Sequence, residues 1–215
     1  MVKQNVKTAR GRKVSSTRWI HRHINDPYVL ASKKEGYRSR AAMKLMELED
    51  RYHLITRAKS CIVDLGSAPG GWLQVACKKK KKHVTLVGLD LKEIESVSGA
   101  FFVQGDFCDD SVVQKVLSLS EGKIDLVMSD MAPSTSGDKM TDHLRIMGLL
   151  ESVADFAAQH LSDGGSLIVK TFVGKHHQDF IKMLRKRFDK VILFKPGASY
   201  KDSSEMFIVS LGKKV

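Results

Sequence analysis

The sequence contains little cysteine and no long apolar run. Only three cysteines occur among the 215 residues, Cys61, Cys77 and Cys108, and no two of them form a C-x-x-C pair. This spacing favours reduced thiols over a disulfide framework, and it predicts a cytoplasmic protein. No segment is apolar over the length that a membrane span requires, and the basic N-terminus lacks the apolar core of a secretion signal.

The histidines do not form a recognisable metal site either. His21 and His23 are two residues apart and His176 and His177 are adjacent, but no cysteine or carboxylate cluster accompanies either pair. A zinc site requires a more complete set of donors. The sequence therefore predicts no bound metal, and it predicts that these histidines contact solvent.

Acidic residues are outnumbered by basic ones. Lys and Arg total 36 against 24 Asp and Glu, which gives a net charge of +12 and a pI of about 9.6. Such a charge favours a polyanionic partner, and RNA or DNA is preferred over a membrane because no long apolar segment is present. Charge alone leaves open a basic enzyme that does not bind nucleic acid.

The length of the chain fits one domain preceded by a short basic segment. Residues 1–17 are polar and carry Lys3, Lys7, Arg10, Arg12 and Lys13 without a periodic apolar pattern. We therefore predict a flexible basic arm over residues 1–17 and a single domain over residues 18–215.

Strands and helices alternate along that domain. The apolar patterns predict strands at 62–65, 84–90, 101–103, 124–130, 166–172, 190–195 and 205–211, and helices at 37–52, after Gly71, and at 110–120, 141–161 and 177–188. Alternation predicts an α/β fold with a mainly parallel sheet and helices on both faces. Because residues 196–204 are too few for a crossover helix, the last strand is predicted to be antiparallel.

The stretch Asp64-Leu65-Gly66-Ser67-Ala68-Pro69-Gly70-Gly71-Trp72 joins the first strand to the next helix. Its glycines allow a tight turn that a ligand can approach closely. The order differs from the dinucleotide fingerprint G-x-G-x-x-G, and Asp64 would repel a diphosphate. A cationic ligand without phosphate fits better, and S-adenosyl-L-methionine (SAM) has those properties.

Two further acidic residues follow later strands. Asp90 ends the second strand at a spacing from the glycine turn that suits a ribose contact, and Asp106 follows the third strand, where it can reach an adenine amino group. Each acid alone is more often a cap or loop residue. Together with Asp64 they favour a nucleoside site.

Four charged residues lie next to apolar strands or within an apolar helix face, where a catalytic role is a reasonable hypothesis. Lys170 ends an apolar strand, where burial would depress its pKa and suit a general base. Asp130 ends the neighbouring strand, and Lys44 lies within the apolar face of the 37–52 helix. Glu205 opens the last strand. Simpler explanations also exist. Lys170 could extend into solvent at the strand end, Lys44 could reach solvent at the edge of its helix, and Glu205 could be a solvated residue of an edge strand.

Several segments resemble the FtsJ/RrmJ family of SAM-dependent ribosomal RNA 2′-O-ribose methyltransferases. They are Y-R-S-R-A-A-M-K-L from Tyr37, D-L-G-S-A-P-G-G-W from Asp64 and M-S-D-M-A-P-S-T-S-G from Met128. The resemblance extends from about Arg18 to the C-terminus. It implies the Rossmann-like methyltransferase fold, a seven-stranded mostly parallel sheet with one antiparallel strand.

The resemblance also implies roles for individual residues. Lys44, Asp130, Lys170 and Glu205 match the family's Lys-Asp-Lys-Glu tetrad, with Lys170 as the base and Asp130 orienting it. The implied cofactor contacts are Gly70, Trp72, Asp90, Asp106 and Asp130, with Asp64 and Gly66 framing the turn. Arg38 and Arg40 are expected to bind RNA phosphates. The chain departs from the family at Tyr200, where arginine is usual, although tyrosine can stack on a base.

The function expected from this resemblance is 2′-O-methylation of a uridine in 23S ribosomal RNA, in the assembled large ribosomal subunit, by a monomer. A transfer-RNA or messenger-cap ribose methyltransferase would use the same tetrad. A non-catalytic RNA-binding module would not need the tetrad, and a small-molecule methyltransferase would not need the basic arm. The sequence leaves the modified nucleotide open.

Removal of residues 1–17 tests the expected RNA-binding arm. The deletion should weaken RNA binding and flatten its dependence on salt concentration, because fewer phosphates are neutralised. The measurement is a series of RNA titrations at increasing salt. An unchanged slope would show that the arm does not contact RNA.

Overall fold

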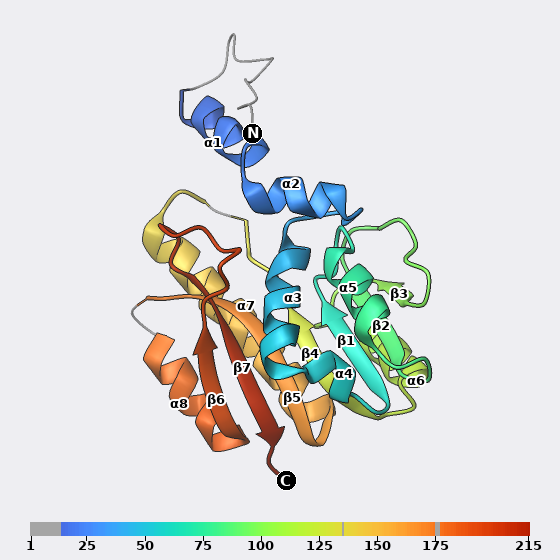
Figure 1. Ribbon diagram of the computed structural model, residues 1–215. Helices are drawn as coiled ribbons and strands as arrows, with labels where there is room; N and C mark the ends of the chain where they lie inside the picture. Colours follow the sequence, from blue (N-terminus) through green and yellow to red (C-terminus); the bar gives the residue numbers. More distant parts are fainter. Residues whose placement is uncertain (1–13, 135, 175–176) are drawn as a thin grey trace.

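The computed structural model describes residues 14–134, 136–174 and 177–215 (Figure 1). Its helices are α1 (Val14–Ile24), α2 (Pro27–Lys34), α3 (Ala41–Tyr52), α4 (Leu54–Arg57), α5 (Gly71–Lys79), α6 (Asp110–Leu119), α7 (Lys139–His160) and α8 (His177–Arg187). Its strands are β1 (Cys61–Leu65), β2 (Thr85–Asp90), β3 (Phe101–Gln104), β4 (Ile124–Ser129), β5 (Leu161–Phe172), β6 (Phe188–Phe194) and β7 (Glu205–Lys213).

One seven-stranded sheet has the order β3-β2-β1-β4-β5-β7-β6. The pairs from β3 to β5 are parallel, whereas β7 is antiparallel to both β5 and β6. The predicted α/β fold with one reversed strand is therefore confirmed. Because β7 is reversed, it begins at the edge of the sheet where β1, β4 and β5 end (Figure 1).

Several boundaries differ from the sequence prediction. Helix α1 begins at Val14, so residues 14–17 of the expected arm are helical, and residues 1–13 lie outside the described residues. Helix α3 begins at Ala41 rather than 37, and before it the backbone N–H of Arg38 donates to the side chain of Gln74. The short helix α4 was not predicted. Strand β5 begins at Leu161, where the sequence predicted the end of a helix followed by a glycine turn.

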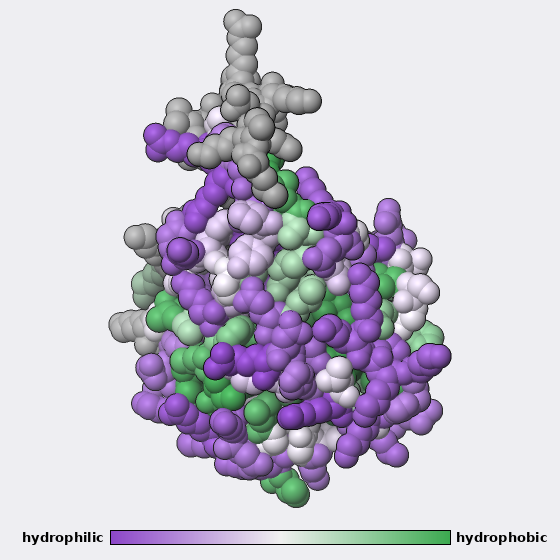
Figure 2. Space-filling model, viewed as in Figure 1, coloured by the Kyte–Doolittle hydropathy of each residue, from purple (hydrophilic) through white to green (hydrophobic). Residues whose placement is uncertain are grey.

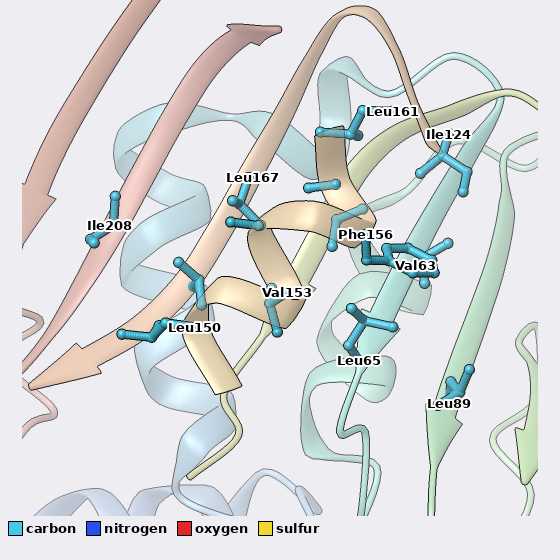
Figure 3. Close-up of a cluster of buried hydrophobic side chains, with 14 of the residues drawn as sticks. Val63, Leu65, Leu89, Ile124, Leu150, Val153, Phe156, Leu161, Leu167 and Ile208 are labelled. Carbon is cyan, nitrogen blue, oxygen red and sulfur yellow. The ribbon is translucent and has the colours of Figure 1, made fainter. Parts of the chain in front are cut away.

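Helices cover both faces of the sheet and form two apolar layers. On one face, α6, α7 and α8 pack on the strands, with Val153 and Phe156 of α7 over Val63 and Leu167 (Figure 3). On the other face, α3, α4 and α5 cover β1, β2 and β7. A fully buried leucine or phenylalanine contributes about 1.5–3 kcal/mol, so these layers fix the sheet firmly. The rigid sheet then positions the residues at its edges.

The surface is mostly polar on the face seen in Figure 2, with apolar areas between the charged side chains. Within the described residues, no helix is long and apolar enough to cross a membrane. The same part of the chain contains no group of three or more potential metal-binding side chains.

The prediction that the histidines contact solvent is wrong for His177. Its side chain is buried at the start of α8, and its Nδ1 lies 3.2 Å from the hydroxyl of Thr171 on β5. Burial lowers the pKa of the imidazole below its ordinary value, because the charged form is poorly solvated there. His177 is therefore a packing residue at the junction of β5 and α8.

Candidate active site

The glycine turn between β1 and α5 brings backbone atoms to the edge of the sheet. Gly66 has a φ of 76°, and a side chain at this position would overlap Met131 Cγ. Gly70 has a φ of 101° and immediately precedes α5, which begins without a side-chain cap. Both positions require glycine, and they leave the first N–H groups of α5 available at the site.

Two connected hollows lie beside this turn. One of about 560 Å³ is bounded by Asp90, Asp106 and Phe107, and one of about 200 Å³ by Asp64, Gly71 and Trp72. Gly66, Ala68 and Asp130 line both. The hollows therefore form one elongated site at the carboxyl ends of β1, β2 and β4, where open α/β sheets bind ligands.

Asp64 is buried at the inner end of this site. Its Oδ2 and the nearby Ser67 Oγ have no hydrogen-bond partner among the described residues. Burial, followed by the charges of Asp130 and Asp90, raises the pKa of Asp64 well above its ordinary value. A buried carboxyl of this kind favours a cationic ligand, which would stabilise its ionised form.

Asp90 and Asp106, the expected ribose and adenine contacts, line the larger hollow at the other end of the site. Asp90 accepts hydrogen bonds from the backbone N–H groups of Ala68 at 2.8 Å and Lys92 at 2.9 Å. Asp106 accepts from Cys108 N–H at 2.9 Å. These bonds orient both carboxylates, and each oxygen retains capacity for a further donor.

The side chain of Trp72 has no free hydrogen-bond donor to offer a bound ligand. Its indole Nε1 donates to the carbonyl of Ala41 at 2.8 Å, and its ring packs against Phe207 with the centroids 5.8 Å apart. The indole nitrogen is thus occupied within the protein. Trp72 can contact a ligand only with its backbone and the remaining surface of its ring.

Lys170, Asp130, Lys44 and Glu205 form a row of alternating charge. The Lys170 ammonium lies 2.9 Å from Asp130 Oδ1 and also donates to the Asp130 carbonyl. Lys44 Nζ lies 3.8 Å from Asp130 and 2.8 Å from Glu205. All four side chains are largely buried. The structure thus places together four residues that the sequence separates by up to 161 positions.

Glu205 is ionised by its neighbours despite its burial. Burial opposes the charged form, but the Lys44 ammonium, the Ser199 hydroxyl and Lys170 outweigh it and lower the pKa of Glu205 below its ordinary value. Ser199 donates to Glu205 at 2.6 Å. Glu205 therefore acts as a fixed negative partner for Lys44.

Arg38 occupies a place that differs from the expected phosphate contact. Its guanidinium donates to the carbonyls of Pro69 at 3.1 Å, Glu95 at 2.6 Å and Ser96 at 2.9 Å. These bonds tie the glycine turn to the loop after β2. The geometry assigns Arg38 to holding these loops, and an RNA phosphate would have to displace existing bonds.

Arg40 is similarly occupied. It donates to Asp26 at 2.6 Å and to the Ala198 carbonyl, and its guanidinium lies 3.9 Å from the centroid of the Tyr200 ring. Arg22 lies over the same ring at 4.1 Å. The expected RNA contacts of Arg40 and Tyr200 are therefore not available as free side chains, because both groups already bind within the protein.

Sequence reasoning missed the residues that support the row of charge. Ser199 orients Glu205, and Glu47 accepts the backbone N–H groups of Gly197 at 2.6 Å and Ala198 at 2.9 Å. No local pattern marks Glu47, because its partners lie 150 and 151 positions away in the sequence.

The chain is similar to known methyltransferases. Residues 37–213 match the family model described as FtsJ-like methyltransferase. The chain is 49% identical over 208 residues to Ribosomal RNA large subunit methyltransferase E of Gluconobacter oxydans, covering 97% of this chain and 76% of the relative. The protein of the same name from Roseobacter denitrificans is 48% identical over 219 residues, and the match covers 98% of this chain and 91% of that relative.

A solved structure is also similar. It is the crystal structure of a candidate ribosomal RNA methyltransferase from Plasmodium falciparum, with a TM-score of 0.73 and 32% identity. The match covers 82% of this chain and 98% of that one. Fold and sequence therefore agree on the same family.

Replacing Glu205 with glutamine tests the electrostatics of the row. Glu205→Gln should lower the free energy of unfolding at pH 7 by about 1–3 kcal/mol, since Lys44 loses its charged partner. The folded-state pKa of Glu205 lies below its ordinary value of 4.5. The stabilisation is therefore present above that pH and disappears as the pH falls through the folded-state pKa.

The measurement is urea unfolding of both proteins from pH 7 down to about pH 3, with the exposed Glu151→Gln as control. A difference between wild type and Glu205→Gln that stays constant over the whole acid range would contradict this account.

Proposed function

The chain belongs to the FtsJ-like methyltransferase family, and on that premise we propose that it methylates the 2′-hydroxyl of a uridine in 23S ribosomal RNA. The proposed substrate is the assembled large ribosomal subunit and the proposed cofactor is SAM. The relatives named Ribosomal RNA large subunit methyltransferase E support the RNA substrate. The net charge of +12 supports a polyanionic partner.

The observation that carries the proposal is the row Lys170, Asp130, Lys44 and Glu205 beside the elongated site. Asp130 lines both hollows and also binds Lys170. A group bound along the hollows would therefore end next to the lysine. This arrangement suits transfer to a hydroxyl, which must be held in position and lose its proton.

The residues along the hollows fit SAM. Asp64, with its unpartnered Oδ2, offers a place for a cationic group, and Asp90 and Asp106 offer acceptors for ribose hydroxyls and an adenine amino group. Gly66 and Gly70 hold the turn at positive φ, and the space beside them is filled by the side chains of Met131 and Arg38. SAM would supply an activated methyl group there. Trp72 lines the smaller hollow.

Lys170 is the proposed general base. It accepts the proton of the ribose hydroxyl at Nζ, so it must first be present as the neutral amine. Asp130 holds Nζ in place through a contact of 2.9 Å, and Lys44 stands on the other side of Asp130. Lys44 also lies 3.8 Å from the same Asp130 carboxylate.

Lys44 and Glu205 are proposed to complete the site on the substrate side. Because Glu205 neutralises Lys44, the lysine stays fixed while its ammonium can still donate to an RNA oxygen. We place the reaction in the cytoplasm, carried out by a monomer without a metal ion.

SAM binding should depend on Asp90. Asp90→Ala removes the proposed acceptor for the ribose hydroxyls, and charge-assisted hydrogen bonds contribute about 1.5–3 kcal/mol. The SAM dissociation constant should therefore rise by about tenfold or more. Titration calorimetry measures it, with the exposed Asp110→Ala as control. Unchanged affinity in Asp90→Ala would remove Asp90 from the site.

Lys170 decides between an enzyme and a binding module. Lys170→Ala should keep SAM and RNA affinity, but turnover should fall by about 10²–10⁴-fold, the usual effect of losing a general base. Lys170→Arg should not restore turnover, because a guanidinium stays protonated. The assay is transfer of labelled methyl from SAM to large ribosomal subunits, with the exposed Lys190→Ala as control.

The same assay separates the alternative substrates. Naked 23S RNA, transfer RNA and capped messenger RNA are offered in parallel, and the modified nucleotide is mapped. An RNA with hydrogen in place of the target 2′-hydroxyl should bind without accepting methyl. Methylation of that RNA would place the mark on a base and end the ribose proposal. Wild-type turnover in Lys170→Arg would show that the site needs positive charge rather than a base.

A further inference from the structure

Tyr200 lies between the N-terminal helices and the body of the protein. Its ring is contacted by the guanidinium of Arg22 on α1, 4.1 Å from the centroid, and by that of Arg40, 3.9 Å away, just before α3. The tyrosine ring is therefore contacted by two cations from different segments, each attracted by the electrons of the ring.

Arg22 makes a second contact with the same loop. Its two terminal nitrogens donate to the two carboxylate oxygens of Asp202, at 2.8 Å and 2.6 Å. A two-bonded pair fixes orientation as well as distance. Helix α1 is thus tied to the loop between β6 and β7 by Tyr200 and Asp202 together. Figure 1 shows α1 and α2 beyond the edge of the sheet where this loop also lies.

The loop continues to the row of charge. Arg40 donates to the Ala198 carbonyl, Ser199 donates to Glu205, and Glu205 binds Lys44. Each step is a direct contact between neighbouring groups. A continuous set of bonds therefore runs from α1 through Tyr200 and its loop to the active site.

Helix α1 has the composition of an RNA-binding element. Its sequence VSSTRWIHRHI contains Arg18, His21, Arg22 and His23 and no acidic residue. Arg18 is exposed and lies one helical turn before Arg22, on the same side of the helix. Lys201 is exposed beside Tyr200. Phosphate groups are the partners that such a surface attracts.

We propose that Tyr200 is a positioning residue that fixes α1, as an RNA-holding element, to the loop that orients Glu205. RNA bound along α1 is then aligned with Lys170. Tyr200 acts through Arg22 and Arg40 and does not stack on a base. The inference rests on the proposed RNA methylation for its kinetic consequence, whereas the docking of α1 can be measured without it.

The first test compares Tyr200→Ala with Tyr200→Phe, which keeps the ring. Large ribosomal subunits from cells lacking the enzyme serve as substrate. Tyr200→Ala should raise KM for the subunits about tenfold, equivalent to about 1.4 kcal/mol. Its kcat should stay within about twofold and its SAM affinity should be unchanged, because the contacts of α1 hold the RNA equally in the ground state and the transition state. Tyr200→Phe should stay near wild type. Wild-type KM in Tyr200→Ala overturns the proposal.

A double-mutant cycle separates positioning from direct base stacking. If Tyr200 acts through Arg22, the double variant Tyr200→Ala with Arg22→Gln should bind RNA about as weakly as the weaker single variant. Additive losses would mean that the ring touches RNA independently, and the proposal would fall. Asp202→Asn should reproduce part of the loss of RNA affinity, because it weakens the two hydrogen bonds that Arg22 donates to the Asp202 carboxylate.

Amide hydrogen exchange gives a readout that needs no activity. Tyr200→Ala should speed exchange in α1 while leaving β1 and β4 as slow as in wild type, since only the docking of one helix is released. Unchanged exchange in α1 overturns the inference even if the enzyme is active. If wild-type protein methylates no RNA but α1 exchange rises in the variant, the proposed function fails and the docking role stands.

Discussion

The alternation of charge along Lys170, Asp130, Lys44 and Glu205 is the constraint on which the rest of the structure depends. Removing any member would leave a largely buried charge without its partner, which is costly. The four residues come from β5, the end of β4, α3 and β7. Each of these elements must therefore keep its position for the row to remain neutral, and the two apolar layers supply the rigidity that this requires.

The topology of the sheet explains how such distant residues meet. Parallel strands end at one edge of the sheet, which places Asp130, just after β4, 2.9 Å from Lys170 near the end of β5. If β7 were also parallel, its last residues would lie at this edge and Glu205, its first residue, would lie at the opposite edge. Because β7 runs in the opposite direction, its first residue, Glu205, reaches that edge, where it pairs in register with Phe172. The reversed strand therefore contributes a residue that the parallel strands cannot.

The site also contains groups that lower the stability of the folded protein. Asp64 Oδ2 and Ser67 Oγ are buried without partners among the described residues, and Gly66 and Gly70 hold a turn that other residues would strain. Unsatisfied polar groups cost stability unless a ligand completes them. These local costs coincide with the elongated hollow, which is the pattern expected where a structure is arranged for binding.

Apolar periodicity and loop length are local properties, so the sequence alone predicted the fold class and the reversed last strand. Strand ends in the sequence also pointed to Asp64 in the glycine turn and to Asp90 and Asp106 after the next two strands. Residue patterns and the resemblance to a known family both singled out Lys170, Asp130, Lys44 and Glu205. The contacts made by other side chains near the site are known only from the tertiary structure. Arg38 and Arg40 became loop-holding groups, His177 became buried, and Tyr200 became the contact between two arginines. Such roles depend on which segments the fold brings together, and no local pattern encodes which carbonyl or ring will lie within reach of a given side chain.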